Sequence, residues 1–494
     1  MGGNFLCSRQ FEETREATRI IPTIAYQLTR KCKSYAGALH NAQNFDAVHQ
    51  DVPTQLRDLL VGPWQQSTRN PHIPPYLIVI DALDEISDGG GSVFLQELLT
   101  VIDEYDLRGF KFLVTSRPDP EVVMLCRSFT SEAVCWLQDV PIEETELDIK
   151  TYLGTKLPML ASSFELAELV QQADGLFVYA ATAVKYLTPH RSITATEQTR
   201  MLKHLVSKSQ KTASMNDSTV LIDILYRQIM VDAFSKFKDD FLACRLRILY
   251  TFLCTAERTS TSVAAGLVAE GGDDMAMAVV KELHAVLYTQ GDRVYWYHAS
   301  FPDFIFDPTR SNFDNLAFWC NEPVHHKLLG ESCFRVMKSG LRFNIGDIKS
   351  SFLLDSDNAE TLSERVNNNI SAVLRYSTRH WTHHLPSPEL VNTNNLLICI
   401  SEFLEIRVLF WIEAMNLLGL RNHCTSILQQ AREWVLKVRI IWFGDVLQQL
   451  LMLFFSAGTT ILNWRMILTK PLISLPTLLE AQLRNRHRTC TSHH

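Results

Sequence analysis

The sequence lacks paired cysteines, long basic runs and an amino-terminal signal sequence, and each absence excludes a class of protein. Its eleven cysteines are scattered without a CxxC spacing, which indicates neither a zinc site nor a disulfide framework. The net charge of −7, with no basic run, argues against a general nucleic-acid binder. Because no basic-then-apolar stretch opens the chain, we expect a cytoplasmic protein with reduced thiols.

Long apolar stretches are also scarce, and one segment alone raises the question of a membrane span. Residues 446–462 are mostly apolar, but they are short for a span, and Gln448 and Gln449 interrupt them. A buried helix is therefore favoured over a transmembrane helix. The remaining composition is that of an ordinary globular protein, with 46% apolar and 20% charged residues in a chain of 494, enough for roughly three domains.

The most informative stretch runs from residue 76 to residue 85. An unbroken apolar run leads into Asp81, Asp84 and Glu85, which is typical of a strand buried on both faces of a parallel sheet. Functional side chains gather at the carboxyl ends of such strands. Asp81 would hold Mg²⁺, as in a Walker B motif, and Asp84 or Glu85 would orient an attacking water. The alternative is a core strand that ends in a solvated acidic turn.

The first 140 residues predict a doubly wound α/β sheet, because apolar strand-like runs alternate with segments of helical periodicity. The apolar run at 110–115 is similar to the one at 76–81 and ends in Thr-Ser-Arg-Pro at 115–118. We therefore expect the two runs to be adjacent parallel strands, with Asp81 and Arg117 at the same edge of the sheet. The expected strands are 4–7, 76–81, 110–115 and 133–140, and the expected helices are 16–33, 46–61 and 92–105.

From residue 141 onward the predicted elements are helical, and no fixed-period repeat is visible. Residues 188–218 are polar and loosely patterned, so a linker is expected there. Residues 293–298 have the pattern of a hairpin strand, such as the wing of a winged-helix module. The expected helices are 142–157, 163–187 with a break at Asp174-Gly175, 220–231, 240–254 and, by periodicity, most of 313–442.

Short motifs follow one another in a specific order over roughly residues 2–440. They are Phe5-Leu-Cys-Ser-Arg9, Pro22-Thr-Ile-Ala-Tyr-Gln27, Ile80-Asp-Ala-Leu-Asp-Glu85, Thr115-Ser-Arg-Pro118, Asp174-Gly-Leu-Phe177, Glu282-Leu-His-Ala-Val-Leu287, His298-Ala-Ser-Phe-Pro-Asp-Phe304, His380-Trp381 and Phe403-Leu-Glu-Ile-Arg-Val-Leu-Phe-Trp411. In this combination the chain resembles the NACHT NTPases of filamentous fungi, which are STAND-class signalling ATPases related to animal NOD-like receptors.

The resemblance implies roles for five residues. Asp81 matches the Mg²⁺-binding aspartate, and Asp84 and Glu85 match the acidic pair near the catalytic water. Arg117 matches the sensor arginine that reports on the γ-phosphate, a task that suits its planar fork. The alternative for Arg117 is a surface ion pair. His298 matches a winged-helix histidine that reaches the β-phosphate of bound ADP, and its alternative is a packed core histidine.

The main departure from the family concerns the phosphate-binding loop. The resemblance implies a Gly-x-x-x-x-Gly-Lys-Ser/Thr motif and the central first strand of the sheet upstream of the strand that contains Phe5 and Leu6. Here Met1-Gly2-Gly3 begins almost on the Phe5-Leu6 strand itself. Gly89-Gly90-Gly91 is a flexible turn and no substitute, since neither Lys-Ser nor Lys-Thr follows it. We therefore expect weak binding of ATP or ADP, because the amides and lysine of that loop supply most phosphate contacts.

Three functional interpretations stay open. The first is an amino-terminally truncated NACHT module, incompetent for nucleotide, that acts as an interaction scaffold. The second is a working ATP- or GTP-dependent signalling NTPase whose P-loop is missing from an incomplete gene model. The third is a non-enzymatic structural adaptor. The expected partners are proteins of a signalling assembly, further copies of the chain included, and neither nucleic acid nor membrane.

The expected fold class is α/β followed by mostly α. Residues 1–140 would form a partial NACHT core with a P-loop-NTPase-like parallel sheet and no Walker A motif. A small helical domain, a winged-helix-like domain, a helical region and a divergent tail would follow, at 141–215, 216–310, 311–440 and 441–494.

Overall fold

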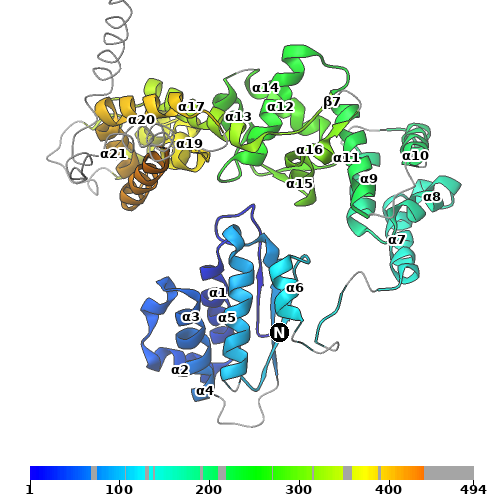
Figure 1. Cartoon of the computed structure of the whole chain (residues 1–494), viewed down its shortest axis with the longest axis horizontal. Helices are drawn as coiled ribbons and strands as arrows, with labels where there is room; N and C mark the ends of the chain where they lie inside the picture. Colours follow the sequence, from blue (N-terminus) through cyan, green and yellow to red (C-terminus); the bar gives the residue numbers. More distant parts are fainter. Residues whose placement is uncertain are drawn as a thin grey trace, which may run out of the picture. The chain divides into compact units, whose positions relative to one another are not determined.

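The computed structural model describes residues 1–67, 75–105, 107–127, 129, 133–136, 140–189, 193–209, 218–269, 271–313, 316–348, 359–387 and 391–438 (Figure 1). Their contacts divide the chain into two compact units. The first comprises Met1–Leu225, Glu257–Thr259 and His284–Tyr297, and the second comprises Tyr226–Ala256, Ser260–Leu283 and the described residues from His298 onward. Segment 446–462 lies outside the described residues. Within the described ranges, every helix is too short or too polar to cross a membrane.

A small parallel sheet forms the centre of the first unit. Its three strands, in spatial order, are β1 (Gly3–Leu6), β2 (Tyr76–Asp81) and β3 (Phe110–Val114). The predicted strands at 4–7, 76–81 and 110–115 are therefore confirmed, and so is the parallel pairing of the last two. The described part of 133–140, residues 133–136 and 140, is not in a strand, which makes that prediction wrong.

The register of the strands brings their carboxyl ends to one edge of the sheet. Ile80 aligns with Phe5 of β1 on one side and with Val114 of β3 on the other. Since all three strands run in the same direction, the residues that follow them share that edge. Asp81 ends β2 and Arg117 follows β3, so the two lie at the same edge, as the sequence predicts.

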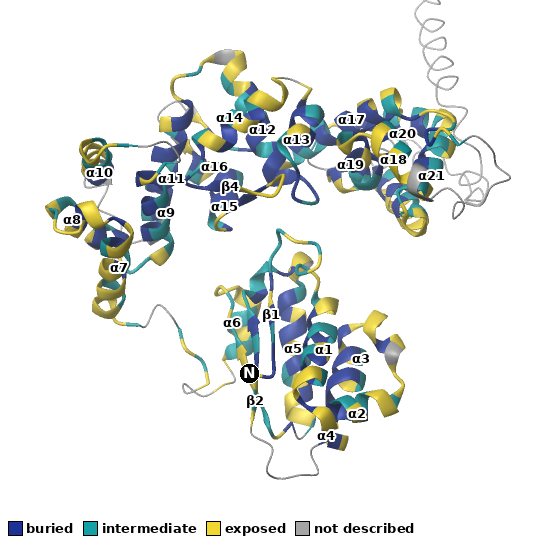
Figure 2. Ribbon diagram, turned by 180° about the vertical axis from the view of Figure 1, so that it is seen from behind, coloured by how far each residue is buried: buried dark blue, intermediate teal, exposed yellow. Residues whose placement is uncertain are grey.

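The long helices α1 (Ile20–Lys31) and α5 (Gly90–Glu104) pack against the same face of the sheet (Figure 2). The core joins Ile24 of α1 and Phe94 of α5 to Phe5 and Ile80, which align in the register. Strands that follow one another in sequence order through right-handed crossovers place their helices on one face. The expectation of a doubly wound sheet is therefore wrong.

The opposite face of the sheet is poorly covered. Leu6, Leu77 and Leu113 are 58%, 38% and 51% exposed, respectively. The expectation that β2 and β3 are buried on both faces is therefore wrong, and its physical reason is the absence of a crossover on this side. Among the described residues the strand order never reverses, so the sheet has no topological switch point, where α/β sheets usually bind ligands.

A side chain protects the outer edge of β1. The backbone N–H of Asn4 donates to Oε1 of Gln27 at 2.7 Å, and Nε2 of Gln27 donates to the carbonyl of Asn4 at 3.0 Å. The Gln27 amide thus occupies the place of a neighbouring strand, which keeps this edge from pairing with another chain. The remaining elements of this region are η1 (Ala17–Arg19), α2 (Lys33–Ala42), η2 (Phe45–His49), α3 (Val52–Gln55), the π-helical η3 (Leu56–Val61), α4 (Gly62–Ser67), η4 (Leu83–Glu85), η5 (Ser87–Gly89) and α6 (Pro120–Cys126).

The rest of the first unit is helical apart from one hairpin. The predicted break at Asp174 is confirmed, since Asp174 adopts a left-handed conformation between two helices. The linker expected at 188–218 contains a helix instead, because Leu202, Leu205 and Val206 recur at helical spacing and are buried. The elements are α7 (Ile142–Lys156), η7 (Pro158–Leu160), α8 (Phe164–Ala173), α9 (Phe177–Leu187), α10 (Ala195–Ser209), and the strands β4 (Leu287–Gln290) and β5 (Arg293–Trp296) of the predicted hairpin.

The second unit is helical around an aromatic core. Trp381 and Trp411 are fully buried, and Nε1 of Trp411 donates to the carbonyl of Thr378 at 2.8 Å. Residues 424–438 are also helical. The other elements are α11 (Ser218–Phe234), which joins the two units, α12 (Asp239–Cys254), α13 (Thr261–Val268), α14 (Gly272–Glu282), α15 (Ser300–Phe306), α16 (Pro308–Ser311), β6 (Asn312–Phe313), β7 (Leu316–Ala317), α17 (Glu322–Gly340), α18 (Ala359–Asn369), α19 (Ala372–His380), η10 (Trp381–His384), α20 (Asn394–Ile406), α21 (Val408–Leu417) and η11 (Arg421–His423).

Candidate functional site

The candidate site lies at the carboxyl edge of the sheet and begins with Asp81. Its Oδ1 accepts a hydrogen bond from Oγ1 of Thr115 at 2.5 Å, and the same hydroxyl accepts from the backbone N–H of Ala82 at 2.9 Å. Ala82 has φ 55° and ψ 51°, a left-handed conformation that costs a non-glycine residue about 1–3 kcal/mol. Thr115 therefore fixes both the carboxylate and the strained turn that follows it.

Asp84 and Arg117 hold one another across this edge. The backbone N–H of Arg117 donates to Oδ1 of Asp84 at 3.0 Å, and Nε donates to Oδ2 at 2.6 Å. Both carboxylate oxygens are thus bonded to the same arginine. The Arg117 side chain is 44% exposed, so solvent screens the pair and its contribution to stability is modest. The observed contacts of Arg117 are those of the alternative interpretation, a surface ion pair.

Glu85 joins the loop after β1 to the same cluster. Its Oε2 accepts from the backbone N–H of Arg9 at 3.1 Å and lies 3.7 Å from Nε of Arg9, while a terminal nitrogen of Arg117 lies 3.9 Å from Oε1. Arg9 stands in one of the motifs of the sequence, but sequence reasoning gave it no role. The available signal for its role was its position just after the first predicted strand, whose end lies beside the strand end that carries Asp84 and Glu85.

A buried thiol lies close to the carboxylates. Burial, followed by the negative charges of Asp81, Asp84 and Glu85, raises the pKa of Cys7 to about 12. A cysteine reacts as its thiolate, so Cys7 stays protonated and unreactive at neutral pH. Nucleophilic chemistry is therefore not expected from this edge of the sheet.

The carboxylates fit a magnesium site only in part. Among the described residues, Asp81, Asp84 and Glu85 do not bring three ligand atoms within 4.8 Å of one another. Mg²⁺ commonly keeps several waters and needs one or two carboxylates plus phosphate oxygens. Asp81 could supply one such ligand, whereas both oxygens of Asp84 already accept hydrogen bonds from Arg117.

His298 lies in the second unit, at the amino-terminal side of α15. Its side chain is exposed, so the interpretation as a packed core histidine is wrong. Nδ1 accepts from the backbone N–H of Ser300 at 3.1 Å and lies 2.7 Å from the Ser300 hydroxyl. The ring therefore caps the first turn of α15, and a contact with nucleotide stays a prediction.

Comparison with known protein families gives a match to the amino-terminal part of the chain. Residues 2–117 match the family model described as Nephrocystin 3, N-terminal, a region associated with NACHT-containing proteins. The match spans all three strands of the sheet and ends at Arg117, so it contains the acidic cluster and its two arginines. No curated protein gives a significant match to the chain.

Proposed function

We propose that the chain is a NACHT-related signalling module that works as a protein-interaction scaffold and does not hydrolyse nucleotide. The family match over residues 2–117 supports the relation to NACHT proteins. The order of the remaining motifs along the chain supports its extension beyond residue 117. Protein partners of a signalling assembly, further copies of this chain included, are the expected ligands.

The strand order of the described sheet is the observation that carries the second half of the proposal. The two strands pair directly from Tyr76 opposite Phe110 to Ile80 opposite Val114. In the NACHT family, by the resemblance above, a central first strand brings the phosphate-binding loop into the sheet. Among the described residues β3 pairs with β2 alone, and no strand of that kind lies along its other edge. A sheet of this order also offers no switch-point crevice for a nucleotide.

The acidic cluster supports the same conclusion through its contacts. In a working site Asp81 would bind Mg²⁺, Asp84 and Glu85 would position water, and Arg117 would bind the γ-phosphate. Here Arg117 donates to Asp84 through both Nε and its backbone N–H. Nε of Arg117 is thus held by Asp84, which leaves its terminal nitrogens as the groups that could donate to a phosphate.

The affinity for nucleotide that the remaining groups can provide is small. A single charged hydrogen bond from Arg117 to phosphate contributes on the order of 1–3 kcal/mol. Micromolar binding needs about 8 kcal/mol. Asp81 acts on phosphate only through Mg²⁺, and a role of His298 at the β-phosphate would add one further contact. These groups together fall short of the requirement.

Titration calorimetry with Mg·ATP tests this proposal on the purified chain of residues 1–494. We expect no heat signal of a micromolar site and no release of phosphate above the buffer rate. The matched pair Asp81→Ala and Asp103→Ala removes either the candidate ligand or an exposed aspartate of α5. A micromolar, Mg²⁺-dependent site that Asp81→Ala abolishes and Asp103→Ala keeps would contradict the proposal. Release of phosphate above the buffer rate in addition would establish the chain as a working NTPase.

The finer domain assignment is part of the same proposal. We take 1–140 as the NACHT-like core, 141–215 as a small helical domain, 216–310 as a winged-helix-like domain and 311–440 as a helical region. The hairpin of β4 and β5, after the helices α12 to α14, supports the winged-helix assignment. The tail at 441–494 lies outside the described residues.

A further inference from the structure

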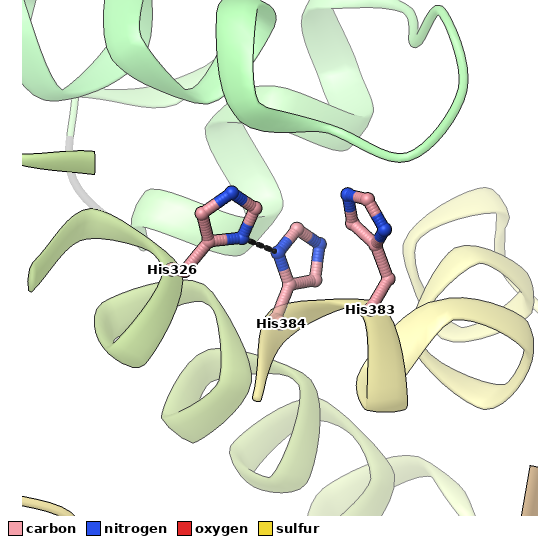
Figure 3. Close-up of side chains that lie close together, drawn as sticks. All are labelled: His326, His383 and His384. Atoms are coloured by element: carbon pink, nitrogen blue, oxygen red, sulfur yellow. Dashed lines mark hydrogen bonds between the residues drawn. The ribbon is translucent and has the colours of Figure 1, made fainter. Parts of the chain in front are cut away.

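Three histidines of the second unit converge from two elements (Figure 3). His326 lies on α17, and His383 and His384 end the turn η10. One ligand nitrogen from each ring lies within 4.8 Å of those of the other two. In the described part of the chain this is the single group of three or more His, Cys, Asp or Glu side chains that meets this condition.

His384 is the best fixed of the three. It is fully buried, and its Nδ1 lies 3.0 Å from Nδ1 of His326. Its Nε2 lies 2.8 Å from the hydroxyl of Tyr376, which in turn accepts from the backbone N–H of Ala256 at 2.9 Å. When Nε2 of His384 donates to that hydroxyl, Nδ1 carries a lone pair directed at His326.

The observed spacing suits a shared ion. Metal–nitrogen bonds of 2.0–2.1 Å with tetrahedral angles place two ligand nitrogens about 3.3 Å apart. The Nδ1 atoms of His326 and His384 are already near this separation. A metal ion would replace the proton that bridges them, and that proton could move to Nε2 of His326. A nitrogen of His383, whose side chain is exposed, lies within 4.8 Å of the other two ligand nitrogens and would supply the third ligand.

An acidic residue stands behind one of the ligands. Oε1 of Glu322, one helical turn before His326 on α17, lies 3.7 Å from Nε2 of His326. A carboxylate that accepts from the second nitrogen of a histidine orients the ring and strengthens it as a metal ligand.

We propose that His326, His383 and His384 bind a divalent transition-metal ion, with Zn²⁺ as the expected ion. Neutral imidazoles suit zinc, and three histidines leave the fourth tetrahedral position for water or another ligand. The ion would tie α17 to η10. Its binding would thus stabilise this contact in the folded chain.

Titration of the full chain with Co²⁺, followed by competition with Zn²⁺, tests the proposal. Cobalt in a tetrahedral site gives a visible absorption band, and we expect stoichiometric binding that zinc displaces. His383→Gln removes an exposed ligand and should abolish the band, because only two of the three histidine ligands remain. The control His204→Gln removes an exposed histidine of α10 and should leave the band unchanged. The midpoint of thermal unfolding should rise with Zn²⁺ in the wild type and in His204→Gln, and not in His383→Gln.

A second variant separates metal binding from a structural role of the cluster. Glu322 has a half-exposed side chain, so Glu322→Gln should fold normally. It should weaken zinc binding about 10–100-fold, the effect typical of losing a partner behind a ligand. The proposal is overturned if the wild type takes up no stoichiometric Co²⁺. It is equally overturned if His383→Gln binds as tightly as His204→Gln, since the ion would then be held elsewhere.

Discussion

Replacing Trp64 by alanine is expected to destabilise the first unit by about 3–5 kcal/mol, the range for removing a large buried aromatic side chain. Trp64 lies on α4 and is fully buried. Its ring stacks on Phe110 with a centroid separation of 3.9 Å and meets Tyr76 edge-on at 5.8 Å. Its Nε1 donates to the carbonyl of Arg108 at 3.0 Å. One side chain thus joins α4 to the first residues of both β2 and β3.

Hydrogen exchange of the β2 and β3 amides measures this effect locally, which matters in a chain of two units that need not unfold together. We expect faster exchange in Trp64→Ala, and Trp64→Phe should lie between it and the wild type because it keeps the stack and loses the N–H bond. Phe164→Ala is the control, since Phe164 is 74% exposed. Equal exchange in Trp64→Ala and Phe164→Ala would contradict the account of this core.

Replacing Gly91 by alanine is expected to disturb the candidate site itself. Gly91 is buried in the first turn of α5, and an added Cβ would lie 2.3 Å from the carbonyl oxygen of Leu83. The clash is with backbone, so Leu83 must move, and it carries Asp84 and Glu85 with it in η4. Such overpacking typically costs about 1–3 kcal/mol. Exchange should quicken in the amides of η4 and the first turn of α5.

The same substitution at a matched glycine is expected to have the opposite effect on stability. Gly37 lies inside α2, and an added Cβ there would meet no atom within 4 Å. Gly37→Ala should therefore stabilise the chain by about 0.5–1 kcal/mol, because alanine loses less backbone freedom on folding. If urea denaturation shifts both variants in the same direction, the close approach of α5 to η4 is not as described.

The strands were predictable because each is an apolar run bounded by polar residues. Residues 76–81 and 110–115 are parallel neighbours, as their patterns indicate. The place of β1 beside β2, which completes the strand order, was not predictable from those patterns. An unbroken apolar run indicates a strand without showing which face is covered, and Leu77 and Leu113 prove to be exposed. Helix α10 was missed because polar residues hide the spacing of Leu202 and Leu205.

The candidate site was predictable as a set of residue types and not as a set of contacts. The carboxylates of Asp81, Asp84 and Glu85 stand where a strand end places them. Their partners Arg9 and Thr115 come from other strand ends, and only the register brings them close. The histidine cluster shows the same limit, because His326 is far in sequence from His383 and His384.

In the strand order that supports the proposal, β2 and β3 are direct neighbours, with no strand between them. The register aligns Asn4 of β1, Val79 of β2 and Leu113 of β3 across one face. Neighbouring strands lie about 4.8 Å apart, whereas strands separated by another lie about 9.6 Å apart. A disulfide needs Cα atoms within roughly 7 Å, so paired cysteines discriminate between the two arrangements.

Mild oxidation of double-cysteine variants of the full chain, with the linked peptides identified by mass spectrometry, is the most direct measurement. We predict a disulfide in Val79→Cys/Leu113→Cys and in Asn4→Cys/Val79→Cys, and none in Asn4→Cys/Leu113→Cys. Failure of the first pair to link, while the Asn4→Cys/Val79→Cys pair does link, would show that another segment separates β2 from β3. That result would contradict the strand order on which the proposal of a scaffold without a nucleotide site rests.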